Sequence, residues 1–420
     1  MAFVFIHGAR QLISLHGAPG PRCGPAASQI QMISDGALLI ENGIIREVGP
    51  TRRVENLAAA RKALDISAAG RVVMPGFVDC HTHLISGPSR LGGEGGGVFK
   101  DGPADVRIVL ENVPFVREAA AKRLLADASV VLRQCLRHGT TTLEAKSGYG
   151  LNLSAELKIL RVLTALGDAP ITVVPTLCAA PALPPEFEGR AGDYIYWACH
   201  ELLPVVHRRG LARFVDAVCD RGAFSASELR PLLAMAHSFG MPLKLSVAGF
   251  APSDGTALAR EFPLTSADHL DHLDEAGIAD LAEAGTIAVL APASTFFLGR
   301  RYPPARALIE RGVPVALASN YSCVTSPTCN MQMVIFLACH ELHMKPAEAI
   351  VAATLNGAYA LKLGHRTGSL EAGKQADLII LNVGDYRELA YEFGINLVDM
   401  TMKQGAVVGD GSGVKWPAHS

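Results

Sequence analysis

Long hydrophobic runs, an excess of one charge and paired cysteines are all missing from this sequence. No stretch approaches the ~18 uninterrupted apolar residues that a membrane span needs. The formal net charge is −2 over 420 residues, so the chain has no basic excess to hold nucleic acid or an anionic membrane. The nine cysteines form no C-x-x-C pair, which indicates a reducing compartment and mostly buried thiols.

A targeting segment is also missing. The N-terminal stretch MAFVFIHGARQLISLHG has no basic region and no clean cleavage site, and it alternates like a β-strand. These absences predict a cytoplasmic protein that acts on a small molecule, without nucleic acid or membrane as a partner. The chain is 49% hydrophobic, which is ample for a large buried core.

Apolar strand-like segments are what the sequence has in abundance. Residues 1–70 contain alternating runs such as ALLIENGIIREVG, which read as antiparallel hairpins. From about residue 73, eight apolar strands alternate with helical patterns, which is typical of a parallel (β/α)₈ barrel. We therefore predict a barrel over 71–365 and a small β-sandwich domain built from both chain ends, 1–70 and 366–420.

The barrel segments can be named from the sequence. The eight expected strands are VVMPGFVDCHTHL (72–84), TTTLEA (140–145), ITVVPTLC (171–178), ARFVDAVC (212–219), MPLKLSV (241–247), LTSADHL (264–270), TIAVLA (286–291) and VPVALAS (313–319). Four of the expected helices cover 128–139, 154–167, 225–240 and 274–285.

Two histidines stand at the end of the first expected barrel strand. His81 and His83 are separated by one residue, so in an extended chain both imidazoles point to the same face. A barrel carries its chemistry at the carboxyl ends of its strands. The pair therefore resembles half of a metal site, and zinc or iron would be the expected metal if one is bound.

Several longer motifs carry a family resemblance. PGFVDCHTHL, EAKSGYGL, FVDAVCDRGAFS, TSADHLD, GTIAVL, GVPVALAS, SPTCNMQM and GSLEAGKQAD occur in family order and at family spacing. On these motifs the chain resembles the amidohydrolase superfamily, and within it the imidazolonepropionases, which open an imidazolone ring. The resemblance implies a homodimer and a metal held by His-x-His, a histidine of strand five and an aspartate of strand eight. The metal polarises water, and the aspartate takes the proton.

The chain departs from that metal site at two strands. The strand-five histidine position is Ser246, which we expect to face the substrate, and the strand-eight aspartate position is Asn320. An asparagine takes no proton at neutral pH. At the catalytic end His269 on strand six is kept. Lys146, in EAKSGYG, is expected to hold its loop.

The end of the site that binds the substrate tail is better kept. The resemblance assigns an arginine and a tyrosine to the propionate carboxylate, and they match Arg90 and Tyr149. A second tyrosine of the family has no counterpart in residues 91–148. The tail-binding groups persist while the water-activating groups are rewritten, which indicates changed chemistry on a related molecule.

A cysteine offers one replacement for the metal. Cys323 follows strand eight, where the family usually has proline, and a thiolate there is a nucleophile that His269 activates. Cys80 also replaces a proline but points away from the barrel axis. The resulting hypothesis is hydrolysis or desulfurisation of a 2-thioxo-imidazolone through Cys323, with Asn320 beside it.

Other interpretations stay open at this stage. His81 and His83 form a metal site with His269 or Cys323 as a substitute ligand, or they are a vestigial pair. Cys323 is then an ordinary small buried side chain. The three functions to separate are an enzyme of altered chemistry on an imidazolone- or hydantoin-like ring with a propionate tail, a metal-dependent imidazolone hydrolase, and a non-catalytic binding protein.

Overall fold

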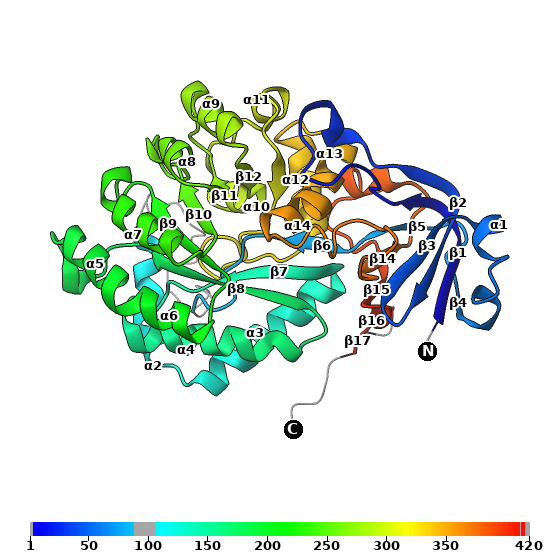
Figure 1. Ribbon diagram of the computed structural model, residues 1–420, viewed down its shortest axis with the longest axis horizontal. Coiled ribbons are helices and arrows are strands. Elements are labelled where there is room, and N and C mark those ends of the chain that lie inside the picture. Colours follow the sequence, from blue (N-terminus) through cyan, green and yellow to red (C-terminus); the bar gives the residue numbers. More distant parts are fainter. Residues whose placement is uncertain (1–2, 88–105, 412, 416–420) are drawn as a thin grey trace.

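The structure is a computed structural model in which residues 3–87, 106–411 and 413–415 are described. The strands among these residues form two sheets. Figure 1 shows a barrel of strands and helices, with a smaller sheet beside it where the blue and red ends of the chain meet. The predicted fold class, a (β/α)₈ barrel plus a small β-sandwich built from both chain ends, is confirmed.

Eight parallel strands form the barrel sheet in the order in which they occur along the chain. Each strand pairs with the next, and an isolated parallel bridge between Thr82 and Tyr321 joins the first strand end to the last. The strands are almost entirely buried because helices cover the outside and side chains fill the inside. They are β6 (Phe77–Asp79), β7 (Thr140–Lys146), β8 (Thr172–Ala180), β9 (Phe214–Cys219), β10 (Leu243–Val247), β11 (Leu264–His269), β12 (Ile287–Leu290) and β13 (Val315–Leu317).

Helices surround the barrel, and the four predicted from the sequence are present as α3, α4, α7 and α9 (Figure 1). Helix α7 begins with a capping box in which Ser225 and Glu228 satisfy each other's backbone N–H groups. In the described part of the chain, no helix is both long and apolar enough to cross a bilayer. The helices are α1 (Thr51–Val54), α2 (Val113–Glu118), α3 (Ala121–Arg137), α4 (Leu153–Ala165), α5 (Ala191–Trp197), α6 (Leu203–Arg209), α7 (Ala226–Ser238), α8 (Leu258–Glu261), α9 (Glu275–Ala284), α10 (Pro292–Phe297), α11 (Ala305–Glu310), α12 (Met331–His340), α13 (Pro346–Val351) and α14 (Gly357–Ala360).

Strands from both chain ends form the second sheet. The first three strands pair antiparallel, as the hairpin pattern predicts, and β5 joins them to β14 from the other end of the chain. Side chains such as Leu12, Ile40 and Ile380 form a core separate from that of the barrel. The strands are β1 (Phe3–Ile13), β2 (Met32–Glu41), β3 (Ile44–Pro50), β4 (Leu64–Ser67), β5 (Val72–Pro75), β14 (Leu378–Leu381), β15 (Val398–Lys403), β16 (Ala406–Asp410) and β17 (Gly413–Val414).

The apolar run 72–84 was expected to be one strand, and it forms two. Strand β5 pairs within the small sheet and β6 starts the barrel, with Gly76 between them. A Cβ at Gly76 would lie 2.3 Å from Cγ2 of Thr141 on β7, so only glycine fits where the chain crosses. This crossing carries the chain from one sheet to the other and brings His81 and His83 to the end of β6.

Candidate active site

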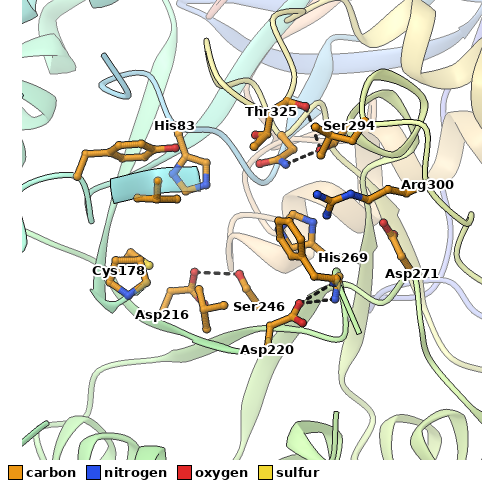
Figure 2. Close-up of a pocket in the computed structure, with 18 of the residues that line it drawn as sticks. His83, Cys178, Asp216, Asp220, Ser246, His269, Asp271, Ser294, Arg300 and Thr325 are labelled. Atoms are coloured by element: carbon orange, nitrogen blue, oxygen red, sulfur yellow. Dashed lines mark hydrogen bonds between the residues drawn. The ribbon is translucent and has the colours of Figure 1, made fainter. Parts of the chain in front are cut away.

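A cavity opens at the carboxyl ends of the barrel strands, where a barrel is expected to carry its chemistry. It encloses about 750 Å³ of space, its open mouth included. Figure 2 shows the lining side chains converging on this space from several strand ends. They include His83, Tyr149, Cys178, Asp216, Asp220, Ser246, His269, Asp271, Ser294, Arg300, Asn320 and Thr325.

The two histidines of the first barrel strand face each other, as their spacing predicts. Their Nε2 atoms lie 3.3 Å apart, and Nδ1 of His81 lies 2.6 Å from Oδ2 of Asp268. Burial and the nearby Lys146 ammonium lower the pKa of His81 well below its usual value and that of His83 to about 3. Both imidazoles are therefore neutral at neutral pH.

His269 lines the same cavity, with its ring centroid 5.0 Å from that of His81. Burial lowers the pKa of His269 as well. Its backbone φ is +80°, and Ala248 after β10 and Asn320 after β13 are also left-handed at +54° and +49°. Left-handed residues other than glycine are rare and concentrate at functional sites, because the surrounding fold must hold them there.

Below the cavity lies a cluster of buried charges that centres on two lysines. The Lys146 ammonium lies 3.0 Å from Asp216, 3.2 Å from Glu144 and 3.4 Å from Asp268. The Lys244 ammonium lies 2.7 Å from Glu144 and 2.9 Å from the carbonyl oxygen of Cys80. Burial opposes the charged form of Lys146, but the carboxylates outweigh it and raise its pKa well above the usual value. Lys146 is thus a central cation of the barrel, whereas the sequence reading gave it only a loop-holding role.

Sequence reasoning left Asp216 and Lys244 out of the site, although a signal for them exists. In a strand, alternate residues face the same side. Glu144 and Lys146 are two apart on β7, and Lys244 and Ser246 are two apart on β10. Charged residues inside otherwise apolar barrel strands must face the interior and find partners there.

One group of buried side chains could offer ligands to a metal. His81, Glu144 and Asp268 offer ligand atoms within 4.8 Å of one another, the single such group in the described residues. However, the Lys146 and Lys244 ammonium groups already bind these two carboxylates.

The positions that the family resemblance assigns to the remaining metal ligands hold a hydroxyl, Ser246, and an amide, Asn320. A catalytic zinc needs three ligands drawn from cysteine, histidine and carboxylate side chains. His269, which the sequence offers as a substitute ligand, does not join His81 and His83 in a group of described residues whose ligand atoms all lie within 4.8 Å of one another. The site therefore does not fit a catalytic metal, and we assign no step to one.

Several buried polar atoms around the cavity have no hydrogen-bond partner among the described residues. They are Nδ1 of His83, Oδ1 of Asp216 and Oδ1 of Asn320. The Asn320 amide nitrogen donates to Ser294 at 3.0 Å, and the Ser246 hydroxyl donates to Oδ2 of Asp216 at 3.3 Å. Leaving such atoms unpaired costs free energy, so a polar ligand that pairs with them is stabilised there.

Cys323 is not one of the described residues that line this cavity. Its thiol lies 2.6 Å from the carbonyl oxygen of Gly87 and 3.0 Å from the Ser86 hydroxyl. Burial raises the pKa of Cys323, so the thiol stays protonated at neutral pH. The structure thus does not bring Cys323 to His269 as an activated nucleophile. Cys178 does line the cavity, and burial raises its pKa too.

Of the two side chains expected to bind the substrate tail, the structure describes Tyr149. Its ring centroid lies 5.6 Å from that of His83, and its hydroxyl is 3.3 Å from the Ser322 hydroxyl. Arg90 lies outside the described residues. A cation not foreseen from the sequence, Arg300, lines the cavity, and its guanidinium lies 3.6 Å from the centroid of the Phe250 ring.

Comparisons with known proteins show the family of the chain. The chain matches the amidohydrolase family over residues 72–408. It is 40% identical to an imidazolonepropionase of Chloroflexus aggregans, over 96% of this chain and 98% of that protein. It is 41% identical to one of Solibacter usitatus, over 92% and 93%.

Solved structures share the fold at lower identity. A zinc-bound adenosine deaminase from Xanthomonas campestris superposes with a TM-score of 0.70 at 20% identity, over 98% of this chain and 94% of that one. A zinc complex of an atrazine chlorohydrolase from Arthrobacter aurescens gives a TM-score of 0.74 at 16% identity, over 98% and 96%. The chain therefore belongs to the amidohydrolase family and is a hydrolase of the imidazolonepropionase type.

Proposed function

We propose that this hydrolase acts on an imidazolone- or hydantoin-like five-membered ring with a propionate tail, and that it does so without a catalytic metal. The single observation that carries the proposal is the replacement of two metal ligands at strands five and eight. There Ser246 and Asn320 stand at the metal-ligand positions, and Lys146 supplies a buried positive charge. The names of the similar proteins support the substrate class.

The lining groups suit a ring that offers N–H donors and a carboxylate. Oδ1 of Asp216 and Oδ1 of Asn320 are unpaired acceptors, so they favour the N–H groups of a cyclic amide or ureide. Tyr149, with Arg90, is proposed to hold the carboxylate tail. His83 and His269 are neutral donors or acceptors beside the ring.

Within this class, a sulfur-bearing ring is the proposed substrate. Hydrolytic desulfurisation adds the oxygen of water to the ring carbon of C=S, and the C–S bond breaks. Sulfur leaves with two protons as hydrogen sulfide, and the ring keeps a carbonyl. Soft sulfur ligands bind zinc and iron strongly. A hydrolase that releases sulfide therefore gains from a site that has lost its metal ligands. Because Cys323 is not among the described lining residues and its thiol donates to the carbonyl oxygen of Gly87, we propose attack by water in place of attack by that thiol.

One purification tests the proposal. The protein is prepared without added metal, its zinc and iron are measured by elemental mass spectrometry, and three ring compounds are assayed with and without a chelator. These are the propionates of imidazolone, hydantoin and 2-thioxo-imidazolone. We expect far less than one equivalent of metal, chelator-resistant turnover, and sulfide release from the thioxo compound.

The other outcomes separate the alternatives. Near-stoichiometric metal with chelator-sensitive ring opening would establish a metal-dependent imidazolone hydrolase with substitute ligands. Binding of the ring compounds without turnover would establish a non-catalytic binding protein. We also propose a homodimer in the cytoplasm with a small-molecule carboxylate as its partner, which sedimentation and cell fractionation would test.

A further inference from the structure

We propose that Asp216 is the general base that takes the proton of the attacking water. The inference rests on the proposed function and adds a named catalytic residue to it. Asp216 lies on β9, is fully buried and lines the cavity. Figure 2 shows its side chain beside that of Ser246 at the edge of the cavity, joined by a hydrogen bond.

The two oxygens of this carboxylate have different surroundings. Oδ2 accepts hydrogen bonds from the Lys146 ammonium at 3.0 Å and from the Ser246 hydroxyl at 3.3 Å. Oδ1 is buried and has no partner among the described residues. One oxygen is thus fixed by a counter-ion and a hydroxyl, while the other keeps its lone pairs for a ligand or a water. A general base needs this geometry, because it must be oriented and still have a free acceptor.

The other carboxylates of the cavity are less suited to accept a proton. Both oxygens of Asp220 are used by backbone N–H groups: Oδ2 by Gly249 at 2.6 Å and Phe250 at 2.9 Å, Oδ1 by Ala251 at 3.1 Å. Burial raises the pKa of Asp271 well above its usual value, and its Oδ2 already accepts from the Thr295 hydroxyl at 3.1 Å. Asp220 therefore positions the loop after β10, and burial disfavours the charged form of Asp271.

The histidines of the cavity are less basic than a free imidazole. Burial lowers the pKa of His83 to about 3 and also lowers that of His269. Asn320 stands where the family resemblance places the base, and an amide takes no proton. Asp216 is the lining carboxylate with a buried oxygen that has no partner among the described residues, and it reaches the cavity from β9.

The proton balance follows from this assignment. A water gives one proton to Oδ1 of Asp216 while its oxygen bonds to the ring carbon, and the π electrons of that carbon move to its sulfur, oxygen or nitrogen substituent. When the C–S bond breaks, the Asp216 carboxyl returns this proton to the sulfur. The hydroxyl on the ring carbon loses the second proton to the departing sulfur as it becomes the carbonyl, so hydrogen sulfide leaves and Asp216 is again a carboxylate. Lys146 and Ser246 act as positioning residues, because they hold Oδ2 and do not touch the reacting atoms.

The isosteric variant Asp216→Asn tests the role. It keeps an oxygen for Lys146 but takes no proton, so we expect kcat to fall about 10²- to 10⁴-fold with substrate affinity changed only a few-fold. The pH–rate profile should lose its acidic limb. In Asp216→Ala, added formate should restore part of the rate, because it supplies a carboxylate in the vacated space.

A matched control exists in the small sheet. Asp377 is also buried and also accepts from a lysine, Lys403 at 2.7 Å, and from a hydroxyl, Thr367 at 3.0 Å. Asp377→Asn removes an equivalent charge outside the cavity, so its kcat and pH profile should match those of the wild type.

Three results would overturn the assignment. One is a wild-type kcat in Asp216→Asn. Another is a rate loss that Asp377→Asn reproduces, which would mark a structural role. The third is an unchanged pH profile without formate rescue. A wild-type protein that binds the three ring compounds but turns none over would overturn the proposed function instead, and the base with it.

Discussion

Two buried lysine–carboxylate groups, one in each sheet, differ in what they leave unpaired. In the small sheet, Asp377 binds Lys403 and Thr367 through Oδ2, and its Oδ1 accepts from the backbone N–H of Gln404 at 2.9 Å. In the barrel, Asp216 binds Lys146 and Ser246 through Oδ2, but its Oδ1 has no partner among the described residues. A structural pair is saturated within the fold, whereas a functional one keeps an acceptor for a ligand.

The two lysines differ in the number of carboxylates around them and in the direction of their pKa shifts. Burial lowers the pKa of Lys403, and its one carboxylate partner, Asp377, does not outweigh that effect. Burial also opposes the charge of Lys146, but Asp216, Glu144 and Asp268 raise its pKa well above the usual value. The barrel cation is therefore held by a network, and the sheet cation by a single pair.

The largest expected effect on stability comes from removing the barrel cation. Lys146→Met leaves three buried carboxylates with less compensation, which should lower the free energy of unfolding by about 3–5 kcal/mol. Lys403→Met removes a cation whose burial is already unfavourable, so the free energy of unfolding should fall by less in this variant. Urea unfolding followed by circular dichroism at pH 7.5 measures both. Equal losses in the two variants would contradict the distinction between network and pair.

The next effect concerns a buried carboxylate without a lysine. Asp79 accepts hydrogen bonds from the backbone N–H and hydroxyl of Ser319, and no ion pair reaches it from the residues that the structure describes. Burial raises the pKa of Asp79 to about 7. The carboxyl group of Asp79 thus binds a proton more tightly in the folded protein than in the unfolded chain. Its contribution to stability is complete below about pH 4 and is lost as pH rises to 7.

Comparing Asp79→Asn with the wild type isolates that contribution. The free energy of unfolding of the wild type should fall by up to about 4 kcal/mol more than that of the variant between pH 4 and pH 8. Urea unfolding across this range at fixed ionic strength gives both curves. Parallel curves would mean that Asp79 is already ionised in the folded protein.

The smallest effect is expected from the two hydroxyl partners. Ser246→Ala removes one of the two hydrogen-bond donors to Oδ2 of Asp216. We therefore expect kcat to fall roughly 10-fold, with a stability loss of about 1 kcal/mol. Thr367→Ala makes the same change beside Asp377, and only stability should fall. Steady-state kinetics and thermal melts on both variants are sufficient. A matching loss of kcat in Thr367→Ala would show that the effect is one of general stability.

Much of the architecture follows from sequence patterns alone. Eight apolar runs separated by amphipathic helices bury both faces of their strands, which a closed parallel barrel satisfies. The i, i+2 spacing of His81 and His83 likewise places both rings on one face, and the structure confirms that they meet. The run 72–84 was misread as one strand, because the contact between Gly76 and Thr141 joins residues far apart in the chain.

The sequence by itself determined the strands, their order and the facing histidines, since these depend on local periodicity. Only the tertiary structure decided the chemistry of the centre. Lys146, Asp216 and Ser246 come from three different strands, and their hydrogen bonds exist only once the barrel closes. The place of Cys323 was decided in the same way, because its thiol donates to the carbonyl oxygen of Gly87, which lies in the segment after β6. Local pattern fixes which way a side chain points, but its partners depend on contacts between distant parts of the chain.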